Sequence, residues 1–234
     1  MPNILQIEKL SVNYAQGVKA LKDVSLALPT GSRLAIIGPN GAGKTSLQLA
    51  IMGGLKYAGT ITLDGVNLST RDGRGIRSQC GMIFENPDDQ LFMPTLLEDV
   101  AFGPLNQGFS SAEAVERSRR AIASVGLEGL EGRCAHHFSA GQKRNASLAT
   151  VLSMNVKLLL LDEPTAGLDF RSRRRLLELL AQRPESMLLA THDMDLVKTL
   201  CDRVVLLDDG QVAAQGATAD ILGNHALLAA HGLA

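Results

Sequence analysis

The sequence predicts an α/β fold in which helices cover both faces of a mostly parallel β-sheet. Short segments made only of apolar residues recur along the chain, and in its second half they alternate with helical segments. Strands of this kind are buried on both faces, as in parallel sheets covered by helices. A glycine-rich turn at residues 38–45 joins one apolar segment to a helix and favours the same class.

The first part of the chain is predicted to contain several strands and one helix. Alternating or fully apolar runs indicate the strands, which are Val24–Leu28, Leu34–Ile37, Thr60–Leu63 and Cys80–Phe84. The glycine-rich turn leads into a helix from about Lys44 to Leu55. Asp64 and Gly65 are typical of a turn, and the basic, glycine-rich segment Arg71–Arg77 is expected to be an exposed loop.

The second part begins with a mostly helical segment, at approximately residues 87–155, inserted between core strands. Ser110 and Glu113 have the spacing of a capping box and predict the start of one helix. Strands and helices then alternate, namely Val156–Leu161, Phe170–Gln182, Met187–Ala190, Asp193–Leu200 and Val204–Leu207. Because no linker of disordered composition interrupts the chain, we expect one domain over residues 1–234, with 87–155 as a helical subdomain.

Composition disfavours several classes of protein. The chain has 234 residues, of which 45% are hydrophobic and 20% charged, so it has the composition of a folded domain. Its net charge of −1 and aromatic content of 3% disfavour a basic or base-stacking nucleic-acid binder, and we expect no nucleic-acid partner. No apolar run approaches a membrane span and the first residues lack a signal-peptide pattern, so we expect a soluble chain.

The cysteines and one histidine pair give no clear sign of a metal site. Cys80, Cys134 and Cys201 are widely spaced and form no C-x-x-C motif, which predicts free thiols. His136 and His137 could indicate a metal site, but no Cys or carboxylate stands beside them at ligand spacing, so a solvated loop is favoured.

The glycine-rich turn carries a complete phosphate-binding motif. Gly38–Thr45 matches G-x-x-x-x-G-K-[ST], follows an apolar strand and opens a helix, which is the context that the motif requires. Its backbone N–H groups and the helix N-terminus can cradle phosphate oxygens. Lys44 can reach the β- and γ-phosphates of a nucleotide, and Thr45 can ligate Mg²⁺.

Two acidic residues end a later apolar strand. Asp162 and Glu163 follow Leu158–Leu161, at the strand end where open α/β sheets place ligands. We expect Asp162 to hold Mg²⁺ and Glu163 to point the other way, toward the γ-phosphate, where it can orient and polarise the attacking water. His192 follows the next strand and is expected to face the same phosphate. Glu163 and His192 are therefore the catalytic candidates.

Further motifs resemble those of the ATP-binding subunits of ABC transporters over essentially the whole chain. Residues 138–142 are similar to the LSGGQ signature of that family, with departures at Phe138 and Ala140. Pro164–Asp169 resembles the D-loop, in which Asp169 couples two protomers, and Asp208–Val212 resembles the closing hairpin. The resemblance implies a P-loop NTPase fold of the ABC type, with a mostly parallel core sheet, an antiparallel β subdomain and an inserted helical subdomain.

The resemblance also implies site residues and a second protomer. It implies nucleotide contacts from Tyr14, whose ring would stack on adenine, and from Gly38, Pro39, Asn40, Gly41, Ala42, Gly43, Lys44, Thr45 and Ser46. It implies that ATP bound to one protomer is contacted in trans by Ser139, Ala140, Gly141 and Gln142 of another. The second protomer would be an identical chain or a homologous ATPase, and ATP with Mg²⁺ would be the cofactors.

One departure concerns the position called the Q-loop in this family. The segment Met82–Pro87 places Glu85 where the family carries a glutamine. A carboxylate could still ligate Mg²⁺ but could not donate an amide hydrogen bond.

The segment Phe84–Phe92, followed by Glu98–Pro104, resembles the ATPases of energy-coupling-factor importers for cobalt, nickel, biotin and other vitamins. That resemblance implies a transmembrane scaffold subunit, a membrane subunit that captures the substrate, and a peripheral location on the cytoplasmic face of the inner membrane. Two alternatives stay open: a non-transport ABC ATPase of DNA repair or translation, and a nucleotide-binding module with little turnover. ATPase rates with and without membrane subunits would distinguish them.

Overall fold

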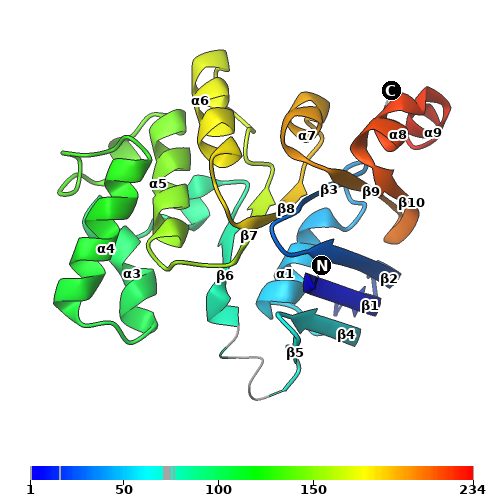
Figure 1. Ribbon diagram of the computed structural model, residues 1–234, viewed down its shortest axis with the longest axis horizontal. Helices are drawn as coiled ribbons and strands as arrows, with labels where there is room; N and C mark the ends of the chain where they lie inside the picture. Colours follow the sequence, from blue (N-terminus) through cyan, green and yellow to red (C-terminus); the bar gives the residue numbers. More distant parts are fainter. Residues whose placement is uncertain (1, 16, 71–74, 76, 234) are drawn as a thin grey trace.

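The larger of two sheets forms the centre of the molecule (Figure 1). The computed structural model describes residues 2–15, 17–70, 75 and 77–233, so most of the predicted loop Arg71–Arg77 lies outside the described residues. In spatial order the strands of this sheet are β10 (Gln211–Ala217), β9 (Arg203–Asp208), β3 (Arg33–Ile37), β8 (Ser186–Ala190), β7 (Leu158–Asp162) and β6 (Cys80–Ile83). All neighbours pair in parallel except β10 and β9, which confirms the mostly parallel sheet.

A smaller antiparallel sheet lies beside it. Its strands, in spatial order, are β2 (Lys19–Pro29), β1 (Asn3–Asn13), β4 (Ala58–Leu63) and β5 (Val66–Asn67). The predicted turn between β4 and β5 is confirmed, since Asp64 and Gly65 both have the positive φ of a tight hairpin. Strand β1 is a long element that the sequence analysis did not predict.

Helices cover both faces of the larger sheet. The longer ones are α1 (Lys44–Met52), α3 (Leu96–Asn106), α4 (Ser111–Ser124), α5 (Ala140–Leu152), α6 (Phe170–Ala181) and α7 (Met194–Leu200), followed by the short α8 (Thr218–Gly223) and α9 (His225–Ala230). Figure 1 shows α1 on one side of the sheet and α6 and α7 on the other. Short 3-10 turns are η1 (Arg77–Gln79), η2 (Pro87–Asp89) and η3 (Ala135–His137).

Strand β7 explains why these strands are apolar throughout. Its Leu158 and Leu160 join the core that contains residues of α1, whereas Leu159 and Leu161 join the core that contains residues of α6 and α7. Successive strand residues point to opposite faces, so a strand covered on both faces needs an apolar residue at every position.

Helices α3, α4 and α5 gather at one end of the large sheet, within the segment predicted to be helical (Figure 1). The predicted capping box is confirmed at the start of α4, where Ser110 and Glu113 bond reciprocally. Several predicted ends were wrong, and the largest error is in β2, which starts at Lys19 rather than Val24. Helix α1 stops at Met52 rather than Leu55 because Gly53 takes a left-handed conformation with φ 79°, and β7 starts at Leu158 rather than Val156.

The closing hairpin predicted at Asp208–Val212 is confirmed by antiparallel pairing of β9 with β10. All three cysteines are free, and Cys80 and Cys201 are buried. His136 and His137 are exposed, and the described residues contain no group of three or more metal-ligating side chains that could hold a metal ion. Among the helices of the described chain, none is long and apolar enough to span a membrane.

Candidate active site

A cavity of about 510 Å³ opens at the carboxyl ends of the central parallel strands. The predicted site residues that line it are Tyr14, Asn40, Gly41, Gly43, Lys44, Thr45, Ser46, Glu85, Asp162, Glu163 and His192. Gly38, Pro39 and Ala42 lie in the same loop without lining the cavity. Ser139, Ala140, Gly141, Gln142 and Asp169 do not line it either. One chain thus brings together the phosphate loop, both acids, Glu85 and His192, but not the signature residues.

The phosphate loop needs glycine at two of its positions because other backbone segments approach closely. A Cβ atom at Gly38 would lie 2.0 Å from the Leu207 carbonyl oxygen, and one at Gly43 would lie 2.5 Å from the Ala20 carbonyl oxygen. Gly43 also caps α1 with φ 103°, and within the described chain no side chain bonds to the free N–H groups of this helix end. These N–H groups are therefore available to an anion.

Lys44 is folded back onto the loop. Its Nζ donates to the carbonyl oxygens of Gly38 at 2.8 Å and Pro39 at 3.0 Å. Burial lowers the pKa of Lys44, and the negative charges of Glu163, Asp162 and Glu85 oppose that shift. A cation surrounded in this way can contact phosphate oxygens that enter the cavity.

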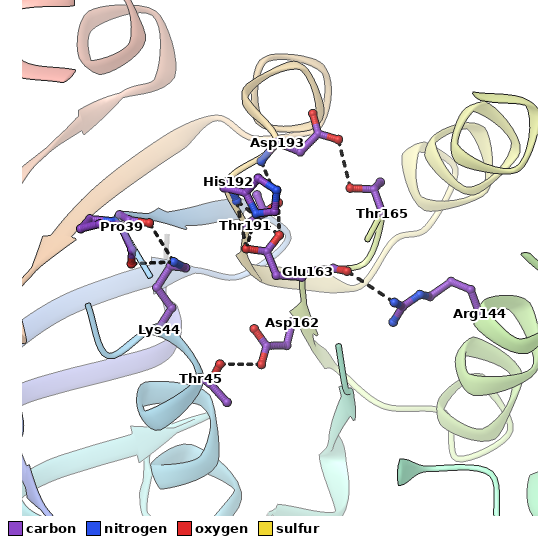
Figure 2. A network of polar contacts seen from close by, with 11 residues as sticks. Pro39, Lys44, Thr45, Arg144, Asp162, Glu163, Thr165, Thr191, His192 and Asp193 are labelled. Atoms are coloured by element: carbon purple, nitrogen blue, oxygen red, sulfur yellow. Dashed lines mark hydrogen bonds and ion pairs between the residues drawn. The ribbon is translucent and has the colours of Figure 1, made fainter. Parts of the chain in front are cut away.

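Thr45 and Asp162 form a pair suited to a divalent cation (Figure 2). Thr45 Oγ1 donates to Asp162 Oδ2 at 2.7 Å. Asp162 is only 2% exposed, and its Oδ1 has no hydrogen-bond partner among the described residues. Burial raises the pKa of Asp162, whereas the bond from Thr45 lowers it. A buried carboxylate oxygen without a partner is unfavourable, and a hydroxyl beside a carboxylate is a donor set that fits Mg²⁺.

Glu163 faces the loop that follows β8 (Figure 2). Its Oε1 accepts from His192 Nδ1 at 2.9 Å and from the His192 backbone N at 3.1 Å, and its Oε2 accepts from Thr191 Oγ1 at 2.9 Å. Asp162 and Glu163 both line the cavity although they are consecutive, because Glu163 has φ 42° and ends the alternation of the strand. A carboxylate in this place can accept a proton from water in the cavity.

The signature segment begins α5, away from the cavity. Ser139 caps this helix through a reciprocal pair with Gln142. A Cβ atom at Gly141 would lie 2.5 Å from Ser172 Oγ of α6, so Gly141 permits close packing of α5 against α6. Asp169 caps α6 by accepting from the Ser172 backbone N at 2.8 Å.

Comparison with known proteins agrees with this geometry. Residues 21–166 match the ABC transporter family. This chain belongs to the ABC transporter family. It is 45% identical to the cobalt import ATP-binding protein CbiO of Rhodobacter capsulatus, covering 100% of this chain and 85% of that one. It is 37% identical to the energy-coupling factor transporter ATP-binding protein EcfA of Methanothermobacter thermautotrophicus, covering 96% and 74%.

Among solved structures, the chain is similar to CbiO1 of Clostridium perfringens, which is part of the ABC transporter complex CbiONQ. The TM-score is 0.84 and the identity 34%, covering 100% of this chain and 96% of the other. The chain is therefore the ATP-binding, ATP-hydrolysing subunit of an ABC transporter, with a P-loop NTPase fold.

Sequence reasoning on this ABC ATPase missed a buried arginine behind the cavity. Arg144 of α5 is 1% exposed and donates to the carbonyl oxygens of Phe84 at 2.6 Å, Glu85 at 2.7 Å and Glu163 at 3.5 Å. It ties the signature helix to the ends of β6 and β7. A signal was present, because Arg144 shares a helix face with the apolar Leu148 and Val151.

Other residues of this ABC ATPase that line the cavity were also not predicted as site residues. They come from β2, from the turn before it and from the β9–β10 hairpin, and they are Val18, Lys19, Ala20, Asp209 and Gly210. They lie far from the phosphate loop in the sequence, so no local motif could indicate them.

Proposed function

We propose that this ABC ATPase hydrolyses ATP in the cavity and thereby powers import through an energy-coupling-factor transporter. The observation that carries the proposal is the meeting of Lys44, Asp162 and Glu163 around one cavity. A cobalt or nickel ion is the first candidate substrate and biotin the second. The likeness to the cobalt import protein of Rhodobacter capsulatus supports a metal ion.

The phosphate loop and Lys44 hold the triphosphate. Ala42 and the glycines let the backbone turn its N–H groups toward the phosphates, with the N-terminus of α1 behind them. Tyr14 stacks on adenine; its Oη lies 2.9 Å from Ser46 Oγ, which keeps the phenol at the edge of the cavity. Thr45 and Asp162 would hold Mg²⁺, with Glu85 as a further candidate ligand, and a bound ion would supply positive charge opposite the phosphates.

Glu163 and His192 carry the chemistry. Glu163 orients the attacking water and accepts its proton. The carboxylate is acceptor-only, so His192 Nδ1 must carry the hydrogen of their shared bond, and Nε2 of this exposed side chain is left outside that bond. From there Nε2 can face the γ-phosphate.

The proposed partners are a second ATPase protomer and two kinds of membrane subunit. Ser139, Gly141 and Asp169 lie outside the cavity, which supports an arrangement with ATP between Lys44 of one protomer and the signature of another. A transmembrane scaffold receives the motion and a separate membrane subunit captures the substrate. The chain would then sit peripherally on the cytoplasmic face of the inner membrane, with residues 87–155 as its helical subdomain.

Reconstitution tests the proposal. The chain is co-expressed with its candidate membrane subunits, the complex is placed in vesicles, and ATP-driven uptake of labelled Co²⁺, Ni²⁺ and biotin is compared. We expect ATP-dependent uptake of one of them, and its loss in Glu163→Gln. ATP hydrolysis without uptake, unchanged by the membrane subunits, would favour a non-transport ATPase. Binding of ATP without turnover in any setting would favour the nucleotide-binding module, which the departures at Glu85 and Ala140 suggest.

A further inference from the structure

We infer that Thr191 is a positioning residue that fixes the carboxylate of Glu163 for attack on ATP. This inference rests on the proposed role of Glu163 as the base. Thr191 is 0% exposed, and its Oγ1 lies 2.9 Å from Glu163 Oε2. It follows β8 directly and precedes His192, which lines the cavity.

The direction of the hydrogen bond follows from the neighbours of Thr191. The backbone N–H of Asp193 donates to Thr191 Oγ1 at 3.0 Å. A carboxylate can only accept, so the hydroxyl hydrogen points toward Glu163, and the Asp193 N–H occupies a lone pair of the same oxygen. A hydrogen bond from a hydroxyl to a carboxylate is charge-assisted and therefore holds the carboxylate firmly.

Thr191 is held from two further sides. Its backbone N donates to the Ile36 carbonyl oxygen at 3.1 Å, which ties it to the strand that leads into the phosphate loop. Asp193 is in turn fixed by Arg173, whose Nη2 and Nε lie 2.7 and 2.9 Å from its carboxylate oxygens. Through these bonds, the Thr191 hydroxyl holds Glu163 in a fixed position relative to β3 and α6.

The other side-chain partner of Glu163 is less fixed. The side chain of His192 is 67% exposed, whereas Thr191 is buried and β-branched, with restricted rotation about χ1. Rotation of the exposed His192 ring would break its bond to Glu163 and would leave the bond from the Thr191 hydroxyl in place. Placement of a base within a fraction of an ångström is worth large factors in rate, so this hydroxyl should matter for turnover.

Steady-state ATP hydrolysis by Thr191→Val, Thr191→Ser and Thr199→Val tests the inference. Valine keeps the shape and removes the hydroxyl, and we expect kcat to fall about 10- to 100-fold with KM for ATP changed less than about 3-fold. Serine restores the hydroxyl, and kcat should stay within about 3-fold of the unmodified chain. Thr199→Val is the matched control, because within the described part of the chain that exposed hydroxyl bonds only to the Asp195 carbonyl oxygen of its own helix.

A second background separates positioning from a general structural role. In Glu163→Gln no base is left to position, so adding Thr191→Val should not lower the residual single-turnover rate further. An equal loss in both backgrounds, or an unchanged kcat in Thr191→Val, would overturn the inference. If the valine variant does not fold, Thr191→Ala takes its place in the same comparison. If Glu163→Gln alone hydrolyses ATP at the unmodified rate, the proposed role of Glu163 fails instead.

Discussion

Glu163 presents to the cavity a carboxylate that is already bonded by the side chain of Thr191 and by the backbone and side chain of His192. Glu163→Gln keeps the size of the side chain and one acceptor oxygen but removes the base. We expect kcat for ATP to fall by about 10²- to 10⁴-fold, because general base catalysis is lost, while ATP affinity stays close to that of the unmodified chain. Steady-state kinetics measures the change in kcat, and calorimetry measures the affinity for ATP.

The matched control for that substitution is Glu178→Gln, which makes the same change on the exposed face of α6. It should leave kcat unchanged. A Glu163→Gln chain that turns over ATP at the unmodified rate would show that another group is the base.

Glu85 lines the same cavity as Lys44 and Asp162, so its charge can bear on the metal ion. Glu85→Gln removes that charge and introduces the glutamine that the family carries at this position. We expect the variant to need more Mg²⁺ for half-maximal hydrolysis, because one negative charge near the cation is lost. We also expect a larger stimulation of the rate by membrane subunits.

ATPase activity against Mg²⁺ concentration, measured with the chain alone and in the reconstituted complex, tests this expectation. Glu98→Gln is the control, because the exposed Glu98 is bonded to Thr95 at the start of α3. Identical Mg²⁺ curves and identical stimulation in Glu85→Gln and the unmodified chain would mean that Glu85 has no functional part.

At the scale of elements, local patterns predicted most of the fold, and one long strand escaped them. The parallel strands are apolar at every position because two cores cover them, and that run is visible in the sequence. Strand β1 is different, because Lys9 has φ 50° and the pairing with β2 shifts register between Ile7 and Leu10. A β-bulge of this kind interrupts the alternation by which a half-buried strand is found.

The same distinction applies to the candidate site. Lys44 and Thr45 belong to a motif of fixed spacing, and Asp162 and Glu163 end a buried run, so the sequence indicated all four. The roles of Arg144 and Thr191 depend on contacts with strands that are distant in the chain. Those contacts are visible only in the three-dimensional structure.

The packing of β6 against α5 gives a prediction on stability. Gly81 lies in β6, and a Cβ atom there would lie 2.0 Å from Val151 Cγ1 of α5. Because Gly81 and Val151 are both buried, Gly81→Ala should lower the free energy of unfolding by about 1–3 kcal/mol through overpacking. Denaturant unfolding measures the change. The control is Gly132→Ala, where nothing lies within 4 Å of the added atom.

A second substitution tests whether the loss of stability in Gly81→Ala comes from contact with Val151. Val151→Ala should cost stability by itself but should recover part of the loss when combined with Gly81→Ala, since it removes the overlapping atoms. If the two losses of stability were strictly additive in the double variant, contact with Val151 would not be the cause of the effect of Gly81→Ala.

At the scale of the whole molecule, the proposed ATP contacts of one chain lie in two separate places. Lys44 lines the cavity, whereas Ser139 caps α5 and does not line it. Figure 1 shows α5 beyond β6 and β7 as seen from α1. A two-fold pair would complete the site, because each chain would give Lys44 to one ATP and Ser139 to the other.

Two variants test whether two chains pair in this way. One lacks the Lys44 contact with ATP, and the other lacks the Ser139 contact. Lys44→Ala removes the charge that holds the phosphates. Ser139→Asp keeps an N-cap for α5, since aspartate caps helices as well as serine does, but sets a negative charge against the triphosphate. Ser139→Asn is the matched control, because asparagine caps equally well without the charge, and it should be more active than Ser139→Asp.

Each of the two variants should be almost inactive alone, and mixing them should restore ATP hydrolysis. In a mixed pair, one site combines Lys44 of the Ser139→Asp chain with Ser139 of the Lys44→Ala chain, and the other site carries both defects. With random pairing half of the pairs are mixed and one of their two sites is intact, so the mixture should reach up to about a quarter of the unmodified activity. The rate should be greatest at equal amounts of the two chains. No recovery at any ratio, with both variants folded, would show that the chain does not pair with itself in this way and would make a homologous ATPase its partner.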